Sequence, residues 1–304
     1  MNKKILITGV AGFIGSKVAE RFIDEGFHVY GVDDLSSGKE KNIPKGLEFI
    51  KLDLSEGKKF SILPRNCKII LHLAGQSSGE ISFDNPILDL KKNTLSTINL
   101  INYGVSNKSE RIVYASSMSV YGNYNKKKLK ENFMLKPLSC YGAGKLASEN
   151  YLEIYKKKIS YVSLRMFNVY GPGQNLENLR QGMVSIYLAQ AIKNAEINVR
   201  GSLNRVRDFI YIDDVVNIWF KASSLTNILN QKFNVGTSKS IKVRELINLL
   251  IKKFPKCKIK ELNGTPGDQY YVCSDNLLLK RKFNYKKFIS LNEGLNRFVN
   301  SVLK

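Results

Sequence analysis

The chain contains few of the residues that build disulfide frameworks and metal centres. Its 304 residues include four cysteines, two histidines and one tryptophan. The cysteines, at positions 67, 140, 257 and 273, lie far apart and show neither metal-ligand spacing nor the pattern of a disulfide framework. We therefore expect no metal site. Unpaired thiols are most simply explained by a reducing compartment, so we expect a cytoplasmic protein.

Long apolar runs are also missing. No stretch approaches the roughly 20 consecutive apolar residues that a membrane-spanning helix needs. The first residues (MNKKILITG) lack the long apolar stretch and the cleavage site of a secretory signal peptide. We therefore expect a protein that neither carries a signal peptide nor inserts into a membrane.

Acidic residues are scarce beside basic ones, since 26 Asp and Glu stand against 48 Lys and Arg, a net charge of +22. Such an excess occurs in proteins that bind nucleic acid, an anionic membrane surface or an anionic substrate. Here the lysines are scattered singly or in short runs, such as 126–128 and 156–158, without a basic stripe interleaved with aromatics. We interpret the charge as a solvated lysine-rich surface that modestly attracts an anionic substrate, and we expect no nucleic-acid partner.

The first half of the chain alternates short apolar runs with stretches of helical periodicity, including a helix expected over 86–103. Such alternation predicts an α/β fold with a doubly wound parallel sheet and right-handed crossovers. Six runs have the length and composition of buried parallel strands: 3–8, 27–32, 47–52, 67–73, 111–115 and 161–167.

The pattern loosens after residue 167, which predicts a smaller α+β lobe. We expect a larger domain over 1–170, to which 205–225 returns, and the lobe over most of 171–304. Helices are expected over 179–194, 213–224, 242–254 and 291–303, interleaved with short strands near 197–200, 207–211, 232–235 and 257–261.

Three glycines follow the first run and lead into a helical pattern. In a strand–turn–helix context, Gly9 allows a tight turn, Gly12 lets the backbone approach a pyrophosphate, and Gly15 permits close packing of helix on strand. The N-terminus of the helix that follows would then bind the negatively charged pyrophosphate. Asp33 ends the second run, 18 residues beyond Gly15, about where an acid holds the adenosine ribose. Because a carboxylate would repel a 2′-phosphate, the sequence favours NAD over NADP.

Tyr141 and Lys145 stand four residues apart, a spacing that places both on one face of a helix. A phenol with a pKa of about 10 is a poor base at neutral pH, and a fixed cation beside it favours the phenolate. Gly142 and Gly144 lie between them, and a cofactor ring against this face would explain why side chains are kept away. Alone, the pair also fits a solvated helix face.

These motifs have companions in a fixed order along the chain, and together they carry a resemblance. The chain resembles the extended short-chain dehydrogenase/reductase family, and within it the UDP-glucose 4-epimerase-like nucleotide-sugar epimerases and dehydratases, which have a Rossmann domain. The matching motifs are Gly9-x-x-Gly12-x-x-Gly15, Asp33, Asp53-Leu54, His72-Leu-Ala-Gly75, Asn93, Ser116-Ser-Met-Ser-Val-Tyr-Gly122, Tyr141-x-x-x-Lys145 and Arg165-x-x-Asn-Val-Tyr-Gly-Pro-Gly173.

The resemblance implies three sets of site residues. Ser117 is implied to be the catalytic hydroxyl, Tyr141 the base, and Lys145 the residue that holds the nicotinamide ribose and tunes Tyr141. The residues implied to bind NAD are Gly9, Gly12, Phe13, Ile14, Gly15, Asp33, Asp34, Ser37, Gly38, Asp53, Leu54, Leu73, Ala74, Gly75, Gln76, Asn93, Ser116, Tyr141, Lys145, Met166 and Val169. Those implied to bind a UDP- or GDP-linked sugar are Ser77, Ser117, Met118, Asn168, Val184, Arg200 and Arg207. His72, inside an apolar run, is expected to pack in the core.

The implied reaction is oxidation of a sugar C4 alcohol to a transient 4-keto sugar, followed by return of the hydride to the other face. Dehydratases and decarboxylases of the family carry a glutamate where Met118 and Ser119 stand, and neither residue replaces that acid/base. We therefore expect a 4-epimerase. A C4 dehydrogenase/reductase or 4,6-dehydratase is the alternative, as is an NAD-sensing or RNA-binding relative, against which the intact Ser117, Tyr141 and Lys145 argue.

Two departures from the family pattern leave the substrate open. Residues 201–207 lack the Gly-Asp-Gly that often precedes Arg-Asp-Phe, and no arginine precedes Pro266-Gly267-Asp268 to hold phosphate. Arg200, Arg205 and Lys258 are candidates to replace that arginine. By analogy with the family we also expect a homodimer, formed through the helices that carry Asn93 and Tyr141.

Overall fold

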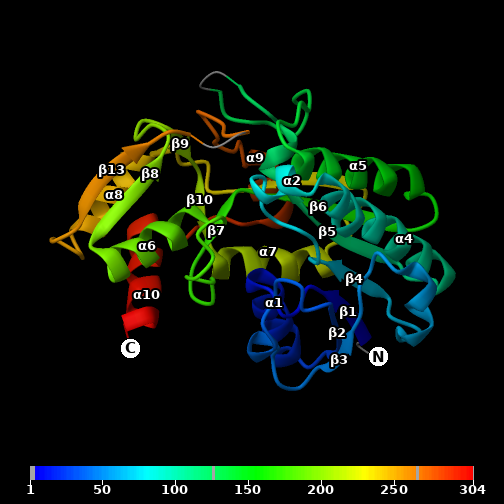
Figure 1. Cartoon of the computed structure of the whole chain (residues 1–304). Coiled ribbons are helices and arrows are strands. Elements are labelled where there is room, and N and C mark those ends of the chain that lie inside the picture. The colour runs from blue at the N-terminus through cyan, green and yellow to red at the C-terminus, as the bar shows by residue number, and fades with distance from the viewer. Residues whose placement is uncertain (1–3, 125–126, 265–266, 304) are drawn as a thin grey trace.

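A seven-stranded parallel sheet forms the centre of the larger part of the molecule, with helices on both faces (Figure 1). The computed structural model of the chain describes residues 4–124, 127–264 and 267–303. The strand order is β11-β6-β5-β4-β1-β2-β3, and every neighbouring pair is parallel, which confirms the predicted α/β class and sheet. These strands are β1 (Lys4–Thr8), β2 (His28–Asp33), β3 (Glu48–Lys51), β4 (Ile69–His72), β5 (Arg111–Ser117), β6 (Ser160–Met166) and β11 (Gln231–Val235).

The helices cover both faces of the sheet and build most of the lobe. They are α1 (Phe13–Asp24), α2 (Ile81–Asp84), α3 (Pro86–Leu90), α4 (Ser96–Ser106), α5 (Cys140–Tyr155), α6 (Met183–Asn194), α7 (Ile212–Ser224), α8 (Val243–Ile251), α9 (Leu277–Phe283) and α10 (Leu291–Leu303). Shorter 3₁₀ turns are η1 (Glu40–Asn42), η2 (Gly57–Ile62) and η4 (Met118–Val120).

The side chains of β1 show why the strands appear in the sequence as unbroken apolar runs. Ile5 and Ile7 point to one face and join an apolar cluster with α1, α7 and α9. Leu6 points to the other face and packs in a cluster with α4 and α5. A parallel sheet covered on both sides needs apolar residues at successive positions, not at alternate ones.

The helix expected over 86–103 is divided into three parts. Between α3 and α4 lies a single π-helical turn, η3 (Lys91–Leu95). Such turns are frequent at functional sites. This one carries Lys92 and Asn93, which lie beside the large cavity described below.

A separate apolar cluster forms the core of the smaller lobe, where α6, α8 and α10 pack around β8. Two-stranded sheets pair β8 with β13, β7 with β10 and β9 with β12. Their bounds are β7 (Asn168–Tyr170), β8 (Glu196–Arg200), β9 (Val206–Arg207), β10 (Phe209–Tyr211), β12 (Ile241–Lys242) and β13 (Lys258–Leu262).

Two of the strands expected after residue 167 are placed differently by the structure. The strand expected at 232–235 is β11, which lies in the central sheet beside β6 and not in the lobe. Its Phe233 packs edge-on against Phe283 of α9, with ring centroids 5.0 Å apart. The strand expected at 207–211 is interrupted at Asp208, whose buried carboxylate accepts hydrogen bonds from Thr237 and Ser274.

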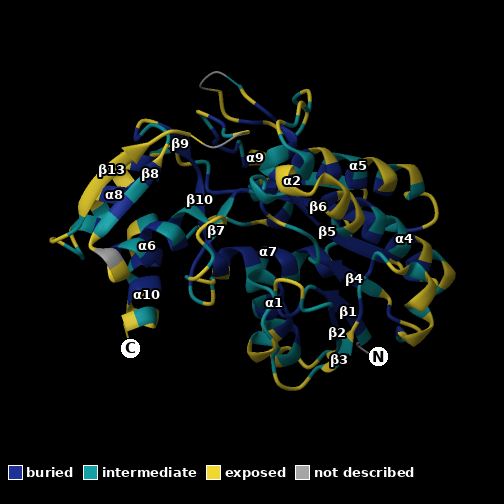
Figure 2. Cartoon of the chain, in the orientation of Figure 1, coloured by how far each residue is buried: buried dark blue, intermediate teal, exposed yellow. Residues whose placement is uncertain are grey.

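Burial follows this arrangement, with the central strands buried and β13 exposed along its length (Figure 2). His72 lies in the core, as predicted, where its ring nitrogens are 2.9 Å from Thr8 Oγ1 and 3.1 Å from Thr97 Oγ1. Burial lowers the pKa of His72 to about 3, so the ring stays neutral. In the described part of the chain, no helix is long and apolar enough to cross a bilayer and no group of metal ligands gathers.

Candidate active site

A cavity of about 1170 Å³ lies between the carboxyl edge of the central sheet and the smaller lobe. Its sheet side is formed by segments that follow β1, β2, β4, β5 and β6, and its lobe side by parts of α6, β8 and β13. In open α/β sheets, ligands bind at this edge. Pockets for one small ligand measure about 300–1,000 Å³, so this cavity is slightly larger than the usual pocket for one small ligand.

The structure brings nearly all of the predicted site residues together around this cavity. Asn93 is the exception, because it lies buried behind Gly75, where a Cβ atom on Gly75 would be 2.5 Å from Asn93 Oδ1. The predicted residues that line the cavity are Gly9, Gly12, Phe13, Ile14, Gly15, Asp33, Asp34, Ser37, Gly38, Asp53, Leu54, Leu73, Ala74, Gly75, Gln76, Ser77, Ser116, Ser117, Met118, Tyr141, Lys145, Met166, Asn168, Val169, Val184, Arg200 and Arg207.

The turn after β1 is packed so closely that only glycine fits. A Cβ on Gly15 would lie 1.9 Å from the Gly9 carbonyl oxygen, and a Cβ on Gly9 would lie 2.7 Å from the Ala74 nitrogen. Gly9 also has a φ of +79°, which favours glycine. The α1 helix begins at Phe13 without a side-chain cap, so its first amide groups have no side-chain acceptor. This end of the cavity is built to receive an anion.

Two acidic clusters stand at the ends of β2 and β3. Asp33 accepts hydrogen bonds from the Ala11 amide at 3.0 Å and the Leu35 amide at 2.9 Å, and burial raises the pKa of its carboxyl. Lys92 pairs with Asp34 and lies 2.7 Å from Asp53. Lys92 lines the cavity but escaped the sequence analysis, because one more lysine in a lysine-rich chain carries no signal.

Ser117, Tyr141 and Lys145 meet where β5 ends and α5 begins. Ser117 is the last residue of β5, and α5 starts one residue before Tyr141, capped by Ser139, whose hydroxyl accepts the Gly142 amide at 3.1 Å. Lys145 Nζ lies 5.7 Å from the centroid of the Tyr141 ring. The pairing of phenol and ammonium predicted from their spacing is therefore present.

The glycines of this helix turn out to serve packing. A Cβ on Gly142 would lie 2.5 Å from the Ser119 carbonyl oxygen, and one on Gly144 would lie 3.3 Å from Asp89 Oδ2. They let α5 approach η4 and α3, so the expectation that a cofactor ring explains both glycines is wrong.

Burial dominates the electrostatics of Tyr141 and Lys145. It raises the pKa of Tyr141 to about 12, although a hydrogen bond with Ser117 acts in the opposite direction. It lowers the pKa of Lys145 to about 8, while nearby Asp89 acts to raise it. The chain's own residues therefore do not bring the phenol into the neutral range, because desolvation of the phenolate outweighs the hydrogen bond with Ser117.

A buried ionic network fixes the segment around Ser117. Arg165 Nη2 on β6 lies 2.7 Å from Glu149 Oε2 on α5, and both side chains are almost fully buried. Ser116 donates its hydroxyl to the same carboxylate at 2.6 Å. Arg165 also donates to the hydroxyl of the buried Tyr121 at 2.8 Å. The network joins β5, β6 and α5 at the catalytic edge.

Two arginines converge on one carboxylate at the lobe side of the cavity. Arg205 and Arg207 are buried, line the cavity, and both form ion pairs with Asp268. Two cations against one anion leave net positive charge at this wall. Of the other candidates to replace the missing arginine, Arg200 lines the cavity from a largely exposed position and Lys258 is not among the described lining residues. Pro266 lies outside the described residues.

Comparison with known proteins assigns the chain to a family. Residues 5–236 match the family model described as NAD dependent epimerase/dehydratase family. The chain belongs to this family. Over 97% of this chain and 97% of the relative, it is 33% identical to the UDP-glucose 4-epimerase of Mycolicibacterium smegmatis.

Solved structures of family members have the same architecture. The UDP-glucose 4-epimerase of Thermotoga maritima with UDP-glucose is 30% identical, with a TM-score of 0.93 over 99% of this chain and 98% of that one. The epimerase of Thermus thermophilus in complex with NAD is 29% identical, with a TM-score of 0.90 over 98% of each. Other relatives are named as a UDP-glucuronic acid decarboxylase and an NDP-hexosamine 5,6-dehydratase.

NAD is the cofactor of this member of the epimerase/dehydratase family, and the residues around the large cavity fit NAD. The closely packed glycine turn brings the backbone to the edge of the cavity beside the uncapped start of α1, where a pyrophosphate would bind. Asp33 uses its oxygens for two backbone amides and keeps lone pairs for the hydroxyls of a ribose. Its negative charge favours NAD over NADP, as the sequence predicted.

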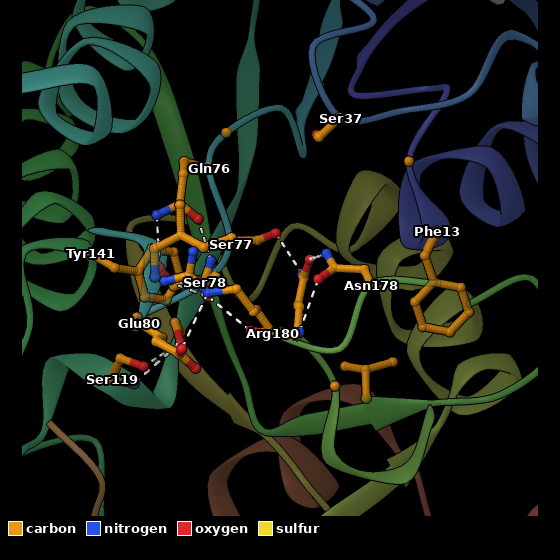
Figure 3. A pocket seen from close by; sticks show the side chains of 18 of the residues that line it. Phe13, Ser37, Gln76, Ser77, Ser78, Glu80, Ser119, Tyr141, Asn178 and Arg180 are labelled. Atoms are coloured by element: carbon orange, nitrogen blue, oxygen red, sulfur yellow. Dashed lines mark hydrogen bonds and ion pairs between the residues drawn. The ribbon is translucent and has the colours of Figure 1, made fainter. Parts of the chain in front are cut away.

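Sequence reasoning missed a segment that lines the cavity and whose Arg180 lies near Ser78 and Glu80 (Figure 3). We call residues 173–182 the bridging segment. Arg180 lies 3.1 Å from Glu80 Oε1 and 2.7 Å from Asp84 Oδ2, and its carbonyl accepts the Ser78 hydroxyl at 3.0 Å. Gln181 donates to Ser77 Oγ at 2.5 Å. No sequence motif predicts these contacts, because they join residues about a hundred positions apart in the chain.

Proposed function

We propose that the chain is an NAD-dependent nucleotide-sugar 4-epimerase that works through a transient 4-keto sugar. The family assignment supports a nucleotide-sugar enzyme with NAD, and several relatives are named as UDP-glucose 4-epimerases. The convergence of Ser117, Tyr141 and Lys145 on one cavity supports chemistry at a sugar hydroxyl. The choice of epimerisation rests on the acidic residues of the cavity.

All the described carboxylates that line the cavity already have partners. A dehydratase needs a free acid/base to remove a second proton, and an ion-paired carboxylate is a weak base because the cation stabilises its charged form. Met118 and Ser119, at the position that carries glutamate in dehydratases, cannot supply one. The five lining carboxylates, each held by a lysine, an arginine or backbone amides, are Asp33, Asp34, Asp53, Glu80 and Asp268.

In the proposed reaction Tyr141 Oη takes the proton of the C4 hydroxyl and later returns it. Ser117 Oγ donates a hydrogen bond to the C4 oxygen and orients it. Lys145 holds positive charge beside the phenolate that forms, and its own lowered pKa keeps it close to the working pH. Bound NAD supplies reversible hydride acceptance at C4. The 4-keto sugar then turns over in the pocket and rebinds in the opposite orientation. The hydride therefore returns to its other face, and the configuration at C4 is inverted.

The remaining predicted residues suit the nucleotide part of the substrate. Arg205 and Arg207, sharing Asp268, present a fork geometry that matches a diphosphate. Asn168, at the start of β7, lines the cavity and is held there by donating its amide to the Asp208 carbonyl at 3.0 Å. Both observations support a nucleoside diphosphate sugar, UDP- or GDP-linked.

The decisive experiment incubates the purified protein with UDP-glucose, UDP-N-acetylglucosamine and GDP-mannose without added NADH, and follows each by NMR. A 4-epimerase converts one of them to its C4 epimer at a fixed equilibrium ratio. A 4-keto-6-deoxy product would instead identify a dehydratase. A product formed only with stoichiometric NAD or NADH would identify a C4 dehydrogenase or reductase, the second candidate.

We also propose that the protein is a homodimer. Large apolar side chains are exposed on two helices that pack together, Ile87 (64%) and Leu90 (54%) on α3 and Ile154 (71%) and Tyr151 (38%) on α5. Such a patch is characteristic of a protein–protein interface.

All four cysteines are free thiols in the structure, which supports the expectation of a reducing, cytoplasmic environment.

A further inference from the structure

A second cavity, of about 650 Å³, lies at the opposite edge of the central sheet from the catalytic residues. It is lined by Arg111 at the start of β5 and by Ser160 at the start of β6. Because β5 runs from Arg111 to Ser117, the two cavities lie at opposite ends of the same strand. Nothing in the proposed reaction uses this second cavity.

Arg111 is unusual among the buried arginines of the described chain. It is 8% exposed and donates from Nη1 to the Ala222 carbonyl at 2.8 Å, but no carboxylate among the described residues lies within ion-pair distance. The other three buried arginines each have one: Arg165 pairs with Glu149, and Arg205 and Arg207 pair with Asp268. A buried cation without an ion-pair partner is costly. Burial accordingly lowers the pKa of Arg111.

The surroundings of Arg111 add further positive charge. Lys156, Lys157 and Lys158, on the turn between α5 and β6, line the same cavity and are exposed. Glu110 also lines the cavity, where its carboxylate lies 3.1 Å from Lys68 Nζ, and its charge acts to raise the pKa of Arg111 although the two form no ion pair. The cavity thus holds an excess of cations around one fixed guanidinium.

Part of the cavity lining is apolar. Phe27, Ile69 and Leu229 belong to it, and several serines line the cavity as well. A volume of about 650 Å³ lies within the range of about 300–1,000 Å³ typical of one small-molecule ligand. A lining that combines cations with apolar side chains suits a molecule that carries an anionic group on an apolar body.

We propose that this second cavity binds a small molecule that carries a phosphate group on an apolar or aromatic body. The planar fork of Arg111 matches the paired oxygens of a phosphate, and it is held in place by the Ala222 carbonyl. Lys157 and Lys158 neutralise the remaining charge at the mouth, and Phe27 and Leu229 contact the apolar body. The bound phosphate supplies the ion-pair partner that Arg111 lacks among the described residues.

The test measures binding of phenyl phosphate to the full-length protein by isothermal titration calorimetry, with NAD and UDP in excess to fill the large cavity. Phenol and inorganic phosphate serve as half-ligands. We expect phenyl phosphate to bind, inorganic phosphate to bind more weakly, and phenol not to bind. Removing one charge-assisted partner in Arg111→Gln should weaken binding by about tenfold or more.

A second variant keeps the test decisive if Arg111→Gln fails to fold. Lys157→Ser/Lys158→Ser changes only exposed side chains, and it should weaken binding by about threefold to tenfold. Lys252→Ser/Lys253→Ser, a lysine pair at the end of α8, is the matched control and should bind like the unmodified protein. Equal affinity in the Lys157/Lys158 variant and the control, or no binding of phenyl phosphate at millimolar concentration, would overturn the proposal.

Discussion

At the scale of single residues, Tyr141 and Lys145 show a conflict between burial and charge. Burial raises the pKa of the phenol to about 12 and lowers that of the ammonium to about 8, so each shift opposes the charged form that the proposed chemistry uses. Groups in active sites are often placed where they serve the reaction although their burial lowers the stability of the fold. A substitution at either residue is therefore expected to change activity and stability in different ways, and the two can be measured separately.

Tyr141→Phe should lower kcat by at least about 10²-fold, because it removes the atom that takes the C4 proton. NAD binding should persist, since the ring and its packing are kept. The matched control is Tyr124→Phe, which deletes a phenol hydroxyl bonded only to the Met134 carbonyl and should leave kcat unchanged. Full turnover by Tyr141→Phe would refute the assignment of the base.

Lys145→Met should abolish most activity yet raise the free energy of unfolding at pH 7 by about 1–3 kcal/mol. The folded-state pKa of about 8 lies below the ordinary value of 10.5, so the charged lysine costs stability fully below pH 8. That cost fades between pH 8 and 10.5, and the advantage of the variant should shrink over the same window. Denaturant unfolding at several pH values measures this, with the exposed Lys130→Met as control. A variant less stable than the parent at pH 7 would contradict the prediction.

At the scale of elements, the pair of Arg165 and Glu149 ties α5 to β6 beneath the catalytic edge. Burial alone would raise the pKa of Glu149, but its bonds with Arg165 outweigh burial and hold the pKa below the usual 4.5. The pair therefore contributes stability above pH 4.5 that is lost as the pH falls further.

Glu149→Gln should lower the free energy of unfolding by about 3 kcal/mol, because it leaves the Arg165 cation buried without a counter-charge. Glu25→Gln breaks the exposed pair with Arg21 and should cost no more than about 1 kcal/mol. Denaturant unfolding compares the two. Equal effects of the two substitutions would show that burial does not strengthen the Arg165 interaction.

The bridging segment is a second element whose role depends on a few polar contacts. Arg180 holds it beside the cavity through Glu80 and Asp84, in pairs that are partly exposed and so screened by salt. Arg180→Ala should raise the dissociation rate of NAD by about threefold to tenfold, and added salt should have the same effect on the parent protein. Stopped-flow fluorescence measures the rate. Arg297→Ala removes an arginine of similar exposure on α10 and should change nothing.

At the scale of the whole molecule, the exposed apolar patch on α3 and α5 predicts association. The purified protein should sediment as a dimer, and Ile87→Glu/Ile154→Glu should sediment as a monomer, because charges on both helices would be buried in the interface. Leu277→Glu, a similarly exposed apolar residue on α9, is the control and should remain dimeric. A monomeric parent protein at micromolar concentration would contradict the prediction.

The sequence by itself determined the features that depend on local spacing. Buried parallel strands must be apolar at successive positions, the turn after β1 must be glycine, and Tyr141 and Lys145 share a helix face because they are four residues apart. These constraints act within a few residues, so they leave a pattern that can be read. They predicted the fold class and favoured NAD, and the family resemblance that they carried implied the other residues around the large cavity.

Only the tertiary structure decided which distant residues meet. The place of β11 in the central sheet, the sharing of Asp268 by Arg205 and Arg207, and the reach of Arg180 to Glu80 all join segments far apart in the chain. Among 74 charged residues, no local pattern distinguishes a charge that will find a buried partner from one that faces water. The sequence likewise contains no sign that Arg111 would be buried with no carboxylate of the described residues within ion-pair distance, which only the packing in the structure shows.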